Sequence, residues 1–323
     1  MTKPVAFLLP GQGSQYPQMA AGLYRSEPVF TDAVDEIVAL LGKDGELVRA
    51  DWLTEAPARP SVPIDHVTRS QVLLFIVDYA LSRQIMSWGI EPTILLGHSA
   101  GELVAAALSG IFELPDAVAL LWDRVQRLAD APPGGMLAVA AKPGQVEPYL
   151  RDGVVIGIVN SPSQLVLAGP QAPLEEIAAA LTAAGRTCRA VPATAAFHSP
   201  GLAPLAGEAV PLIDKLGPRP PRIPVHSGYT TRRLTAEEVA DPRLWAAHPV
   251  EPVLFWPALE TLLAEQDYRL VEAGPGQRLA TVARRHPAVA RGGSEVFAAA
   301  PARPSGPEAD RAALRSLAEA LLG

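Results

Sequence analysis

The sequence is short of cysteine, basic charge and long apolar runs. Its 323 residues include one cysteine, Cys188, which excludes an internal disulfide and a metal site built from several cysteines. There are 27 Lys and Arg against 34 Asp and Glu, which gives a formal net charge of −7. Because phosphate backbones attract basic surfaces, we do not expect nucleic acid as the main partner.

No apolar stretch approaches the roughly 18 residues of a membrane helix. The first four residues do not have the layout of a signal peptide. These two absences predict a cytoplasmic protein without a membrane partner. Hydrophobic residues make up 49% of the chain and charged residues 19%, which is enough apolar material for a large core. We therefore expect one large α/β domain, alone or with a smaller insert.

Strands and helices alternate in the first part of the chain. Residues 5–9 and 93–96 are apolar runs typical of buried parallel strands, and 223–226 and 268–272 predict two more. Helical spacing occurs over 18–24, 29–41 and 70–88, and 310–322 predicts a last amphipathic helix. This alternation predicts a parallel sheet with helices on both faces.

The pattern changes after residue 130. Strands are predicted at 136–141, 154–159, 164–168 and 187–191, with helices at 144–150 and 174–184. The order βαββαβ is that of the ferredoxin-like split motif. The predicted fold class is therefore α/β: a large, α/β-hydrolase-like domain with a parallel sheet (residues 1–130 and 199–323) and an inserted ferredoxin-like small domain (131–198).

The segment Gly97-His98-Ser99-Ala100-Gly101-Glu102 follows the second predicted strand and leads into a predicted helix. It has the G-x-S-x-G pattern of a nucleophile elbow. The two glycines permit a turn too tight for side chains, and this turn exposes Ser99 at the carboxyl edge of the sheet. The amino end of the following helix favours negative charge beside the serine. The elbow predicts acyl chemistry at Ser99.

A nucleophilic serine needs a base, and that base is usually a histidine. Four histidines follow the elbow: His198, His226, His248 and His286. His198 lies in Phe197-His198-Ser199, where the small domain returns the chain to the large one. From there it can reach across a cleft toward Ser99. We predict His198 as the base and interpret the other three as ordinary core or surface residues.

Together these motifs resemble malonyl-CoA:acyl carrier protein transacylases and the acyltransferase domains of polyketide synthases. The resemblance runs from Val5 to about Leu279. The segments that carry it, besides the elbow and Phe197-His198-Ser199, are Pro10-Gly11-Gln12-Gly13-Ser14-Gln15, Gln71, Arg124, Asn160-Ser161-Pro162, Gln164, Trp245, Pro252-Val253 and Gly274-Pro275-Gly276.

The resemblance implies a discrete acyltransferase that works by ping-pong transfer through an acyl-serine. Ser99 would attack a CoA or phosphopantetheine thioester, with Nε2 of His198 as the base. The family implies that backbone N–H groups of Gln12 and Ala100 form the oxyanion hole, and that a backbone carbonyl near Leu254 holds the second histidine nitrogen. It implies acyl-CoA and an acyl carrier protein as partners, with no bound cofactor or metal.

The resemblance also implies where the acyl group binds. Arg124 matches the arginine that grips the free carboxylate of a malonyl group. Ala195 departs from the histidine usual in malonyl-selective members, and Val125 and Leu128 depart from the usual residues beside the arginine. A small Ala195 would enlarge the pocket floor and admit a bulkier acyl group. The remaining predicted substrate residues are Gln71, Asn160 and Phe197.

Basic residues at the mouth of the cleft are the predicted docking points for an acidic carrier protein: Arg151, Arg189, Arg278, Arg284 and Arg285. Three alternatives stay open. One is transfer of an aminoacyl or peptidyl group between two carrier proteins. The second is a thioester-editing hydrolase on the same fold, and the third is a hydrolase with the serine–acid–histidine order of α/β-hydrolases.

Overall fold

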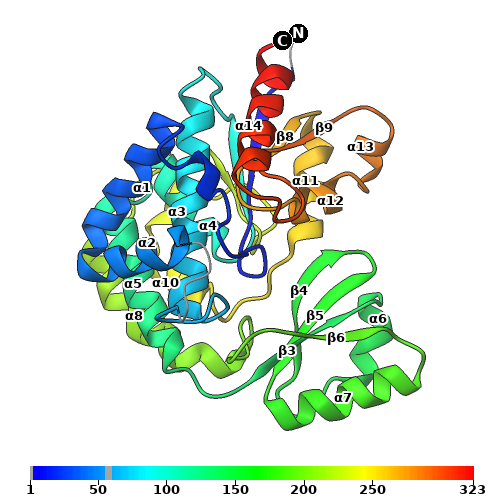
Figure 1. Ribbon diagram of the computed structural model, residues 1–323. Coiled ribbons are helices and arrows are strands. Elements are labelled where there is room, and N and C mark those ends of the chain that lie inside the picture. Colours follow the sequence, from blue (N-terminus) through cyan, green and yellow to red (C-terminus); the bar gives the residue numbers. More distant parts are fainter. Residues whose placement is uncertain (1–2, 55–59) are drawn as a thin grey trace.

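Two separate sheets organise the computed structural model, which describes residues 3–54 and 60–323 (Figure 1). The larger sheet has the order β7-β2-β1-β8-β9, and all its pairs are parallel. Its strands are β1 (Val5–Leu9), β2 (Ile94–Gly97), β7 (Val225–His226), β8 (Arg269–Glu272) and β9 (Glu295–Ala298). The predicted α/β class with a parallel sheet is confirmed.

The centre of the large sheet explains why its strands are apolar throughout. Residues 6–9 of β1 and all four of β2 are buried, because helices cover both faces of a parallel sheet. In the register of this pair Leu9 lies opposite Gly97. The loops that follow β1 and β2 therefore leave the sheet side by side.

The helices of the large lobe pack around this sheet (Figure 1). α3 (Val67–Met86) is buried along most of its length and lies among α1, α2, α4 and α5. It begins three residues before the predicted start, because the His66 side chain accepts a hydrogen bond from the Thr68 N–H there. The other helices are α1 (Pro28–Leu41), α2 (Lys43–Leu53), α4 (Gly101–Ser109), α5 (Leu114–Ala129), α8 (Ala203–Leu216), α9 (Ala236–Ala240), α10 (Pro242–Ala247), α11 (Phe255–Glu265), α12 (Arg278–Ala283), α13 (Pro287–Ala290) and α14 (Pro307–Leu322).

The small lobe is an antiparallel sheet of order β4-β5-β3-β6 with a core of its own. In chain order this is second–third–first–fourth, the arrangement of the ferredoxin-like motif. Its elements are β3 (Gly135–Val139), α6 (Pro143–Val146), the 3-10 helix η2 (Glu147–Tyr149), β4 (Val155–Ser161), β5 (Gln164–Gly169), α7 (Gln171–Ala183) and β6 (Cys188–Val191). They lie within the predicted span 131–198; the exact domain bounds stay a prediction. Residues 1–2 and 55–59 of the predicted large domain lie outside the described residues.

Some predicted elements are wrong or incomplete. The helix predicted over 18–24 is only the 3-10 turn η1 (Ala21–Leu23), because Gln18 and Ala20 have left-handed backbones with φ of 58° and 56°. The helix predicted over 144–150 divides into α6 and η2, since Pro148 has no N–H to continue it. The strand predicted over 223–226 is shorter in the structure and comprises only β7 (Val225–His226). The sequence did not predict α2 or β9.

The two lobes are joined by backbone hydrogen bonds near the centre of the molecule. The Val159 N–H donates to the Val253 carbonyl, and the Val253 N–H donates to the Gly157 carbonyl, each over 2.8 Å. This places β4 of the small lobe against the segment that leads into α11. Within the described ranges, every helix is too short or too polar to cross a bilayer.

Candidate active site

Ser99 occupies the turn between β2 and α4, as the elbow motif predicts. It has a left-handed backbone with φ of 53°, a conformation that costs energy for any residue other than glycine. A Cβ at Gly97 would collide with the backbone of Glu102, and a Cβ at Gly101 would collide with the Leu9 carbonyl at the end of β1. The two glycines thus let the turn pack against its own helix and against the neighbouring strand.

His198 meets Ser99 from the segment that leaves the small lobe. Its Nε2 lies 2.7 Å from the Ser99 Oγ. Its Nδ1 lies 2.9 Å from the backbone carbonyl of Glu251, to which it donates. A carbonyl can only accept, so this contact leaves the lone pair of the imidazole on Nε2, facing the serine hydroxyl.

The residue that holds this histidine is therefore Glu251, and the prediction of Leu254 is wrong. The Leu254 carbonyl accepts the Ala258 N–H over 2.9 Å, because Leu254 is the residue that caps the start of α11. Glu251, three residues before Leu254, lies beside His198, and its carbonyl accepts the imidazole N–H. The family motif Pro252-Val253 lies between the two positions.

The buried setting of His198 keeps it neutral. The side chain is 4% exposed, and this burial lowers its pKa to about 4, although the hydrogen bond to Glu251 acts in the opposite direction. The imidazole is therefore unprotonated near neutral pH and able to accept the proton of Ser99.

Two backbone N–H groups close to Ser99, those of Gln12 and Ala100, are candidates for an oxyanion hole. In the described part of the chain, neither Gln12 nor Ala100 donates its N–H to another protein group. Gly11 lets the loop after β1 pack directly against the elbow, because a Cβ at this position would collide with the His98 carbonyl and approach the Ser99 Cβ. Gln71 steadies this loop through its Nε2, which donates to the Gln12 Oε1 over 3.2 Å. Unpaired N–H groups in this position are the usual components of an oxyanion hole.

A cleft of about 1030 Å³ between the lobes contains these groups. The predicted residues that line it are Gln12, Gln71, Ser99, Ala100, Arg124, Leu128, Asn160, Phe197 and His198. The Asn160 Oδ1 lies 2.8 Å from the His98 Nε2, so β4 and the elbow touch across the cleft. Ala195 does not line it: it is 1% exposed and pairs with Pro133 in the neck between the lobes. That a small residue at this position enlarges the pocket floor stays a prediction.

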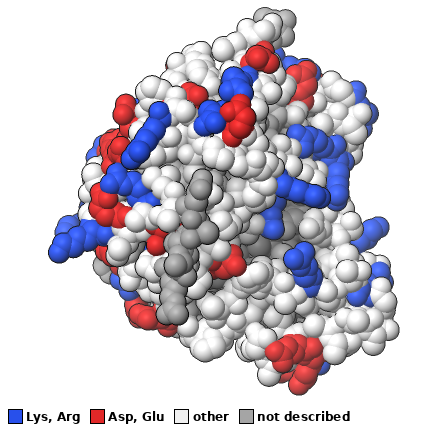
Figure 2. Space-filling view, in the orientation of Figure 1, with Lys and Arg blue, Asp and Glu red and all other residues white. Residues whose placement is uncertain are grey.

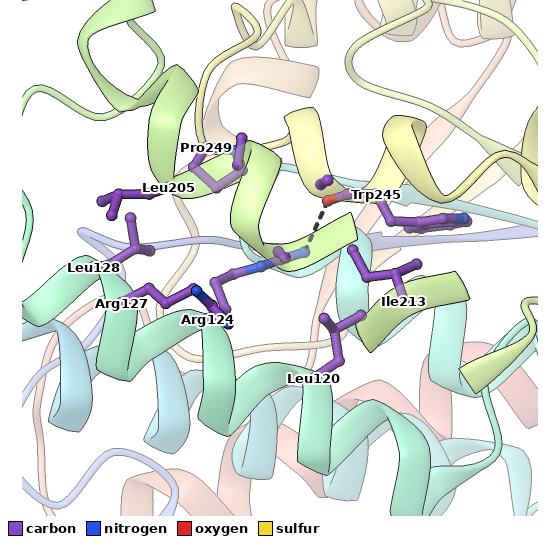
Figure 3. A pocket seen from close by; sticks show the side chains of 11 residues that line it. Leu120, Arg124, Arg127, Leu128, Leu205, Ile213, Trp245 and Pro249 are labelled. Atoms are coloured by element: carbon purple, nitrogen blue, oxygen red, sulfur yellow. Dashed lines mark hydrogen bonds between the residues drawn. The ribbon is translucent and has the colours of Figure 1, made fainter. Parts of the chain in front are cut away.

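Arg124 points from α5 toward α10 and is almost fully buried (Figure 3). Its Nη2 donates to the Trp245 carbonyl over 3.3 Å. Asp123, the nearest acid in sequence, pairs instead with Arg127 at 2.7 Å. Among the described residues no carboxylate forms an ion pair with Arg124. A small cavity of about 20 Å³ lies behind the guanidinium, bounded by Leu128, Leu205 and Ile213 (Figure 3).

Two further side chains line the cleft: Tyr229, which no sequence motif singled out, and His248, which the sequence suggested was an ordinary core or surface residue. Their rings stack with centroids 4.3 Å apart and planes inclined by 13°. Glu102, fully buried behind them, has Oε1 3.8 Å from the His248 Nε2. Burial raises the pKa of Glu102 to about 8 and holds the pKa of His248 well below its usual range. Glu102 lies within the elbow motif, but no sequence pattern marks Tyr229 or His248.

Basic side chains stand on both sides of the hollow in the molecular surface (Figure 2). Arg189 of β6, Arg278 of α12 and Arg285 line the cleft, whereas Arg151 and Arg284 do not. Arg151 pairs with Glu176 on the small lobe at 3.2 Å, and Arg284 donates to the Gln277 side chain. In residues 3–54 and 60–323, no group of three or more His, Cys, Asp or Glu side chains is arranged to hold a metal ion.

Comparison with known proteins identifies the family. A family model for the acyl transferase domain matches residues 6–303. The chain belongs to the acyl transferase domain family. The resemblance inferred from the motifs is thereby confirmed, and the chain is an acyltransferase of the type found in polyketide synthases.

Relatives of this acyltransferase occur within much longer proteins. One is a phenolphthiocerol/phthiocerol polyketide synthase protein of Mycobacterium tuberculosis, 36% identical over 283 residues, a match that covers 88% of this chain and 19% of that protein. The acyl transferase domain of SpnD, solved in complex with 2-(pent-4-yn-1-yl)malonyl, is 32% identical with a TM-score of 0.89, over 97% of this chain and 74% of that one. FabD of Acinetobacter baumannii shares the fold with a TM-score of 0.86 and 23% identity, over 100% and 99% of the chains.

Proposed function

We propose that this acyltransferase transfers an acyl group from a CoA or carrier-protein thioester to the phosphopantetheine thiol of an acyl carrier protein, by way of an ester on Ser99. The observation that carries this proposal is the 2.7 Å contact of the Ser99 Oγ with a neutral His198 Nε2, beside two N–H groups that have no acceptor among the described residues. A serine, a base and oxyanion donors are the parts that acyl transfer requires.

In the first half-reaction the Ser99 Oγ attacks the thioester carbonyl carbon while His198 Nε2 takes the hydroxyl proton. The N–H groups of Gln12 and Ala100 donate hydrogen bonds to the carbonyl oxygen and stabilise the negative charge that develops on it. The C–S bond then breaks, and the imidazolium returns the proton to the departing thiolate. In the second half-reaction the carrier thiol gives its proton to His198 and attacks the Ser99 ester. The Ser99 oxygen leaves and takes the proton back.

The acyl group proposed is malonyl or a substituted malonyl. Arg124 is buried without an ion-pair partner in the described residues, and a carboxylate on the substrate would supply its counter-charge. The SpnD domain, solved with a malonyl group that carries a pentynyl chain, is an example of this fold with a bulky malonyl ligand. An aminoacyl or peptidyl group without a free carboxylate would leave the buried guanidinium without a counter-charge, so Arg124 supports the malonyl proposal over these alternatives.

The proposed partners, acyl-CoA and a carrier protein, both bring phosphate to the cleft. Arg189 approaches from the small lobe and Arg278 from the large one. Burial and the nearby charge of Arg189 lower the pKa of Arg278, so an anion between the two would relieve their repulsion. With Arg285 they form a basic mouth that suits the phosphate of a phosphopantetheine arm or an acidic protein surface. Arg151 and Arg284, which lie off the cleft, are not part of this proposal.

Mass spectrometry of the intact protein tests the proposed function. Incubation with malonyl-, methylmalonyl- and ethylmalonyl-CoA should give an acyl adduct that Ser99→Ala abolishes and that a holo carrier protein removes. Ser14→Ala, which changes another serine of the cleft, should keep the adduct. Transfer only from an acylated carrier protein would refute a carboxylated CoA donor. Rapid release of free acid without transfer would instead support a thioester-editing hydrolase.

A further inference from the structure

Tyr229 lies between His198 and His248 in the cleft. Its ring centroid is 6.1 Å from that of His198, the proposed base, and its other neighbour is the stacked ring of His248. Tyr229 lines the cleft together with Ser99 and Arg124. It therefore stands where an acyl group on Ser99 would extend toward Arg124.

The surroundings of Tyr229 fix its place relative to the nucleophile. His248, 2% exposed, is held between the rings of Tyr229 and Trp245, with a centroid 5.2 Å from the latter. The Gly228 N–H, one residue before Tyr229, donates to the Glu102 Oε2 over 3.0 Å. Glu102 belongs to the first turn of α4, the helix that follows Ser99. The hydrogen bond of Gly228 therefore fixes the backbone next to Tyr229 to this helix. These contacts hold the Tyr229 ring in the cleft beside His198.

The Tyr229 hydroxyl is a neutral hydrogen-bond donor in this position. Burial, with the nearby Glu102, raises the pKa of Tyr229 well above its usual range, so the phenol keeps its proton at all ordinary pH values. Ser99 and Arg124, which line the cleft with Tyr229, act on this pKa in the opposite direction. Arg124 is close enough to stabilise negative charge on the Tyr229 oxygen. The Tyr229 hydroxyl as a hydrogen-bond donor and the Arg124 guanidinium as a cation together suit an anionic acyl group.

We propose that Tyr229 is a specificity-determining residue, whose hydroxyl donates a hydrogen bond to a carboxylate oxygen of the acyl group carried on Ser99. This inference rests on the proposed function and deepens it. A carboxylate has two oxygens, and the guanidinium of Arg124 and the phenol of Tyr229 would each take part in binding them. An acyl group without a carboxylate gains nothing from the hydroxyl.

Tyr229→Phe tests the hydroxyl alone, because phenylalanine keeps the ring that stacks on His248. We expect kcat/KM for acylation of Ser99 by malonyl- and methylmalonyl-CoA to fall about tenfold to a hundredfold, the range for a lost hydrogen bond to a charged group. Acetyl- and propionyl-CoA should change by less than about twofold. Tyr79→Phe is the matched control: Tyr79 stacks on Phe75 with centroids 6.2 Å apart, away from the cleft, and its loss of a hydroxyl should leave both donor classes unchanged.

Combining Tyr229→Phe with Arg124→Ala separates a shared substrate contact from a structural effect. If both residues bind one carboxylate, the double variant should lose less than the product of the two single losses.

Equal loss with charged and uncharged donors in Tyr229→Phe, or no loss at all, would refute the specificity role. If the unaltered protein forms no Ser99 adduct with any thioester, it is the proposed function that fails. An adduct formed normally but insensitive to Tyr229→Phe overturns the role of Tyr229 alone.

Discussion

Arg124 is a buried charge that the proposed function assigns to binding the substrate. Removing a guanidinium from water is costly unless a counter-charge compensates it, and the described part of the protein offers Arg124 a backbone carbonyl but no carboxylate ion pair. The proposed function assigns the counter-charge to a group that arrives with the ligand. Its neighbour Arg127 already pairs with Asp123 and Glu208.

Replacing Arg124 with alanine should cripple the transfer of carboxylated acyl groups. We expect kcat/KM for malonyl-CoA to fall by a factor on the order of a hundred or more, the worth of a bidentate charged contact. Uncharged acyl donors should be affected severalfold at most. Arg127→Ala on the same helix serves as the control and should leave both reactions near their original rates. Equal losses for charged and uncharged donors in Arg124→Ala would mean that the arginine is structural.

At the scale of single elements, the elbow depends on two close backbone approaches. Gly101 is the first residue of α4, and it touches the end of β1 without an intervening side chain. A methyl group there would press on the Leu9 carbonyl, which is held by the sheet and cannot retreat. The serine can thus be presented only if strand and helix are this close.

Gly101→Ala should therefore destabilise the protein and displace Ser99. Overpacking of this kind typically costs about 1–3 kcal/mol, and urea unfolding followed by tryptophan fluorescence would measure it. Acylation of Ser99 should fall in the same variant, even in the fraction that remains folded. Gly144→Ala is the matched change, since a Cβ at Gly144 in α6 meets no atom within 4 Å. It should leave stability the same or slightly raised, and a similar loss in both variants would contradict the role of close packing.

What the sequence could predict follows from how local each feature is. The elbow, the βαββαβ order and the Ser99–His198 pair were all predicted, because glycine spacing, strand periodicity and a family motif lie in short segments. The turn around Ala20 was missed because left-handed backbone at Gln18 and Ala20 has no signal in residues that suit a helix. Glu251 acts through its carbonyl, which every residue possesses, so only the path of the chain could identify it. Tyr229 and His248 meet through tertiary packing alone.

At the scale of the whole molecule, stability should respond to the proton on Glu102. Burial raises the pKa of this carboxyl to about 8 from its ordinary value of 4.5. Between these two pH values the folded state holds a proton that the unfolded state has released, so the free energy of unfolding should decrease as the pH rises through this window. The contribution is complete below pH 4.5 and lost above about pH 8.

Glu102→Gln removes this proton exchange while a side-chain oxygen remains to accept the Gly228 N–H. The stability of the original protein relative to the variant should thus decline with rising pH, by at most about 1.4 kcal/mol per pH unit, between pH 4.5 and 8. Urea unfolding at a series of pH values measures the difference. Glu91→Gln, at an exposed position, should run parallel to the original protein. A constant difference between the Glu102→Gln variant and the original would refute a buried, protonated Glu102.

The interruption of the large sheet by the small lobe has a consequence for how the chain is made. β1 and β2 are synthesised first, but their outer partners β8 and β7 emerge only after the whole small lobe. Until then the central pair of the sheet has two open edges, whereas the small lobe already holds all four of its strands between residues 135 and 191. The small lobe can therefore fold during synthesis before the large sheet has all its strands. In the mechanism that we propose, the nucleophile Ser99 is thus synthesised before the small lobe and the base His198 after it, so the two can meet only once the small lobe has been made.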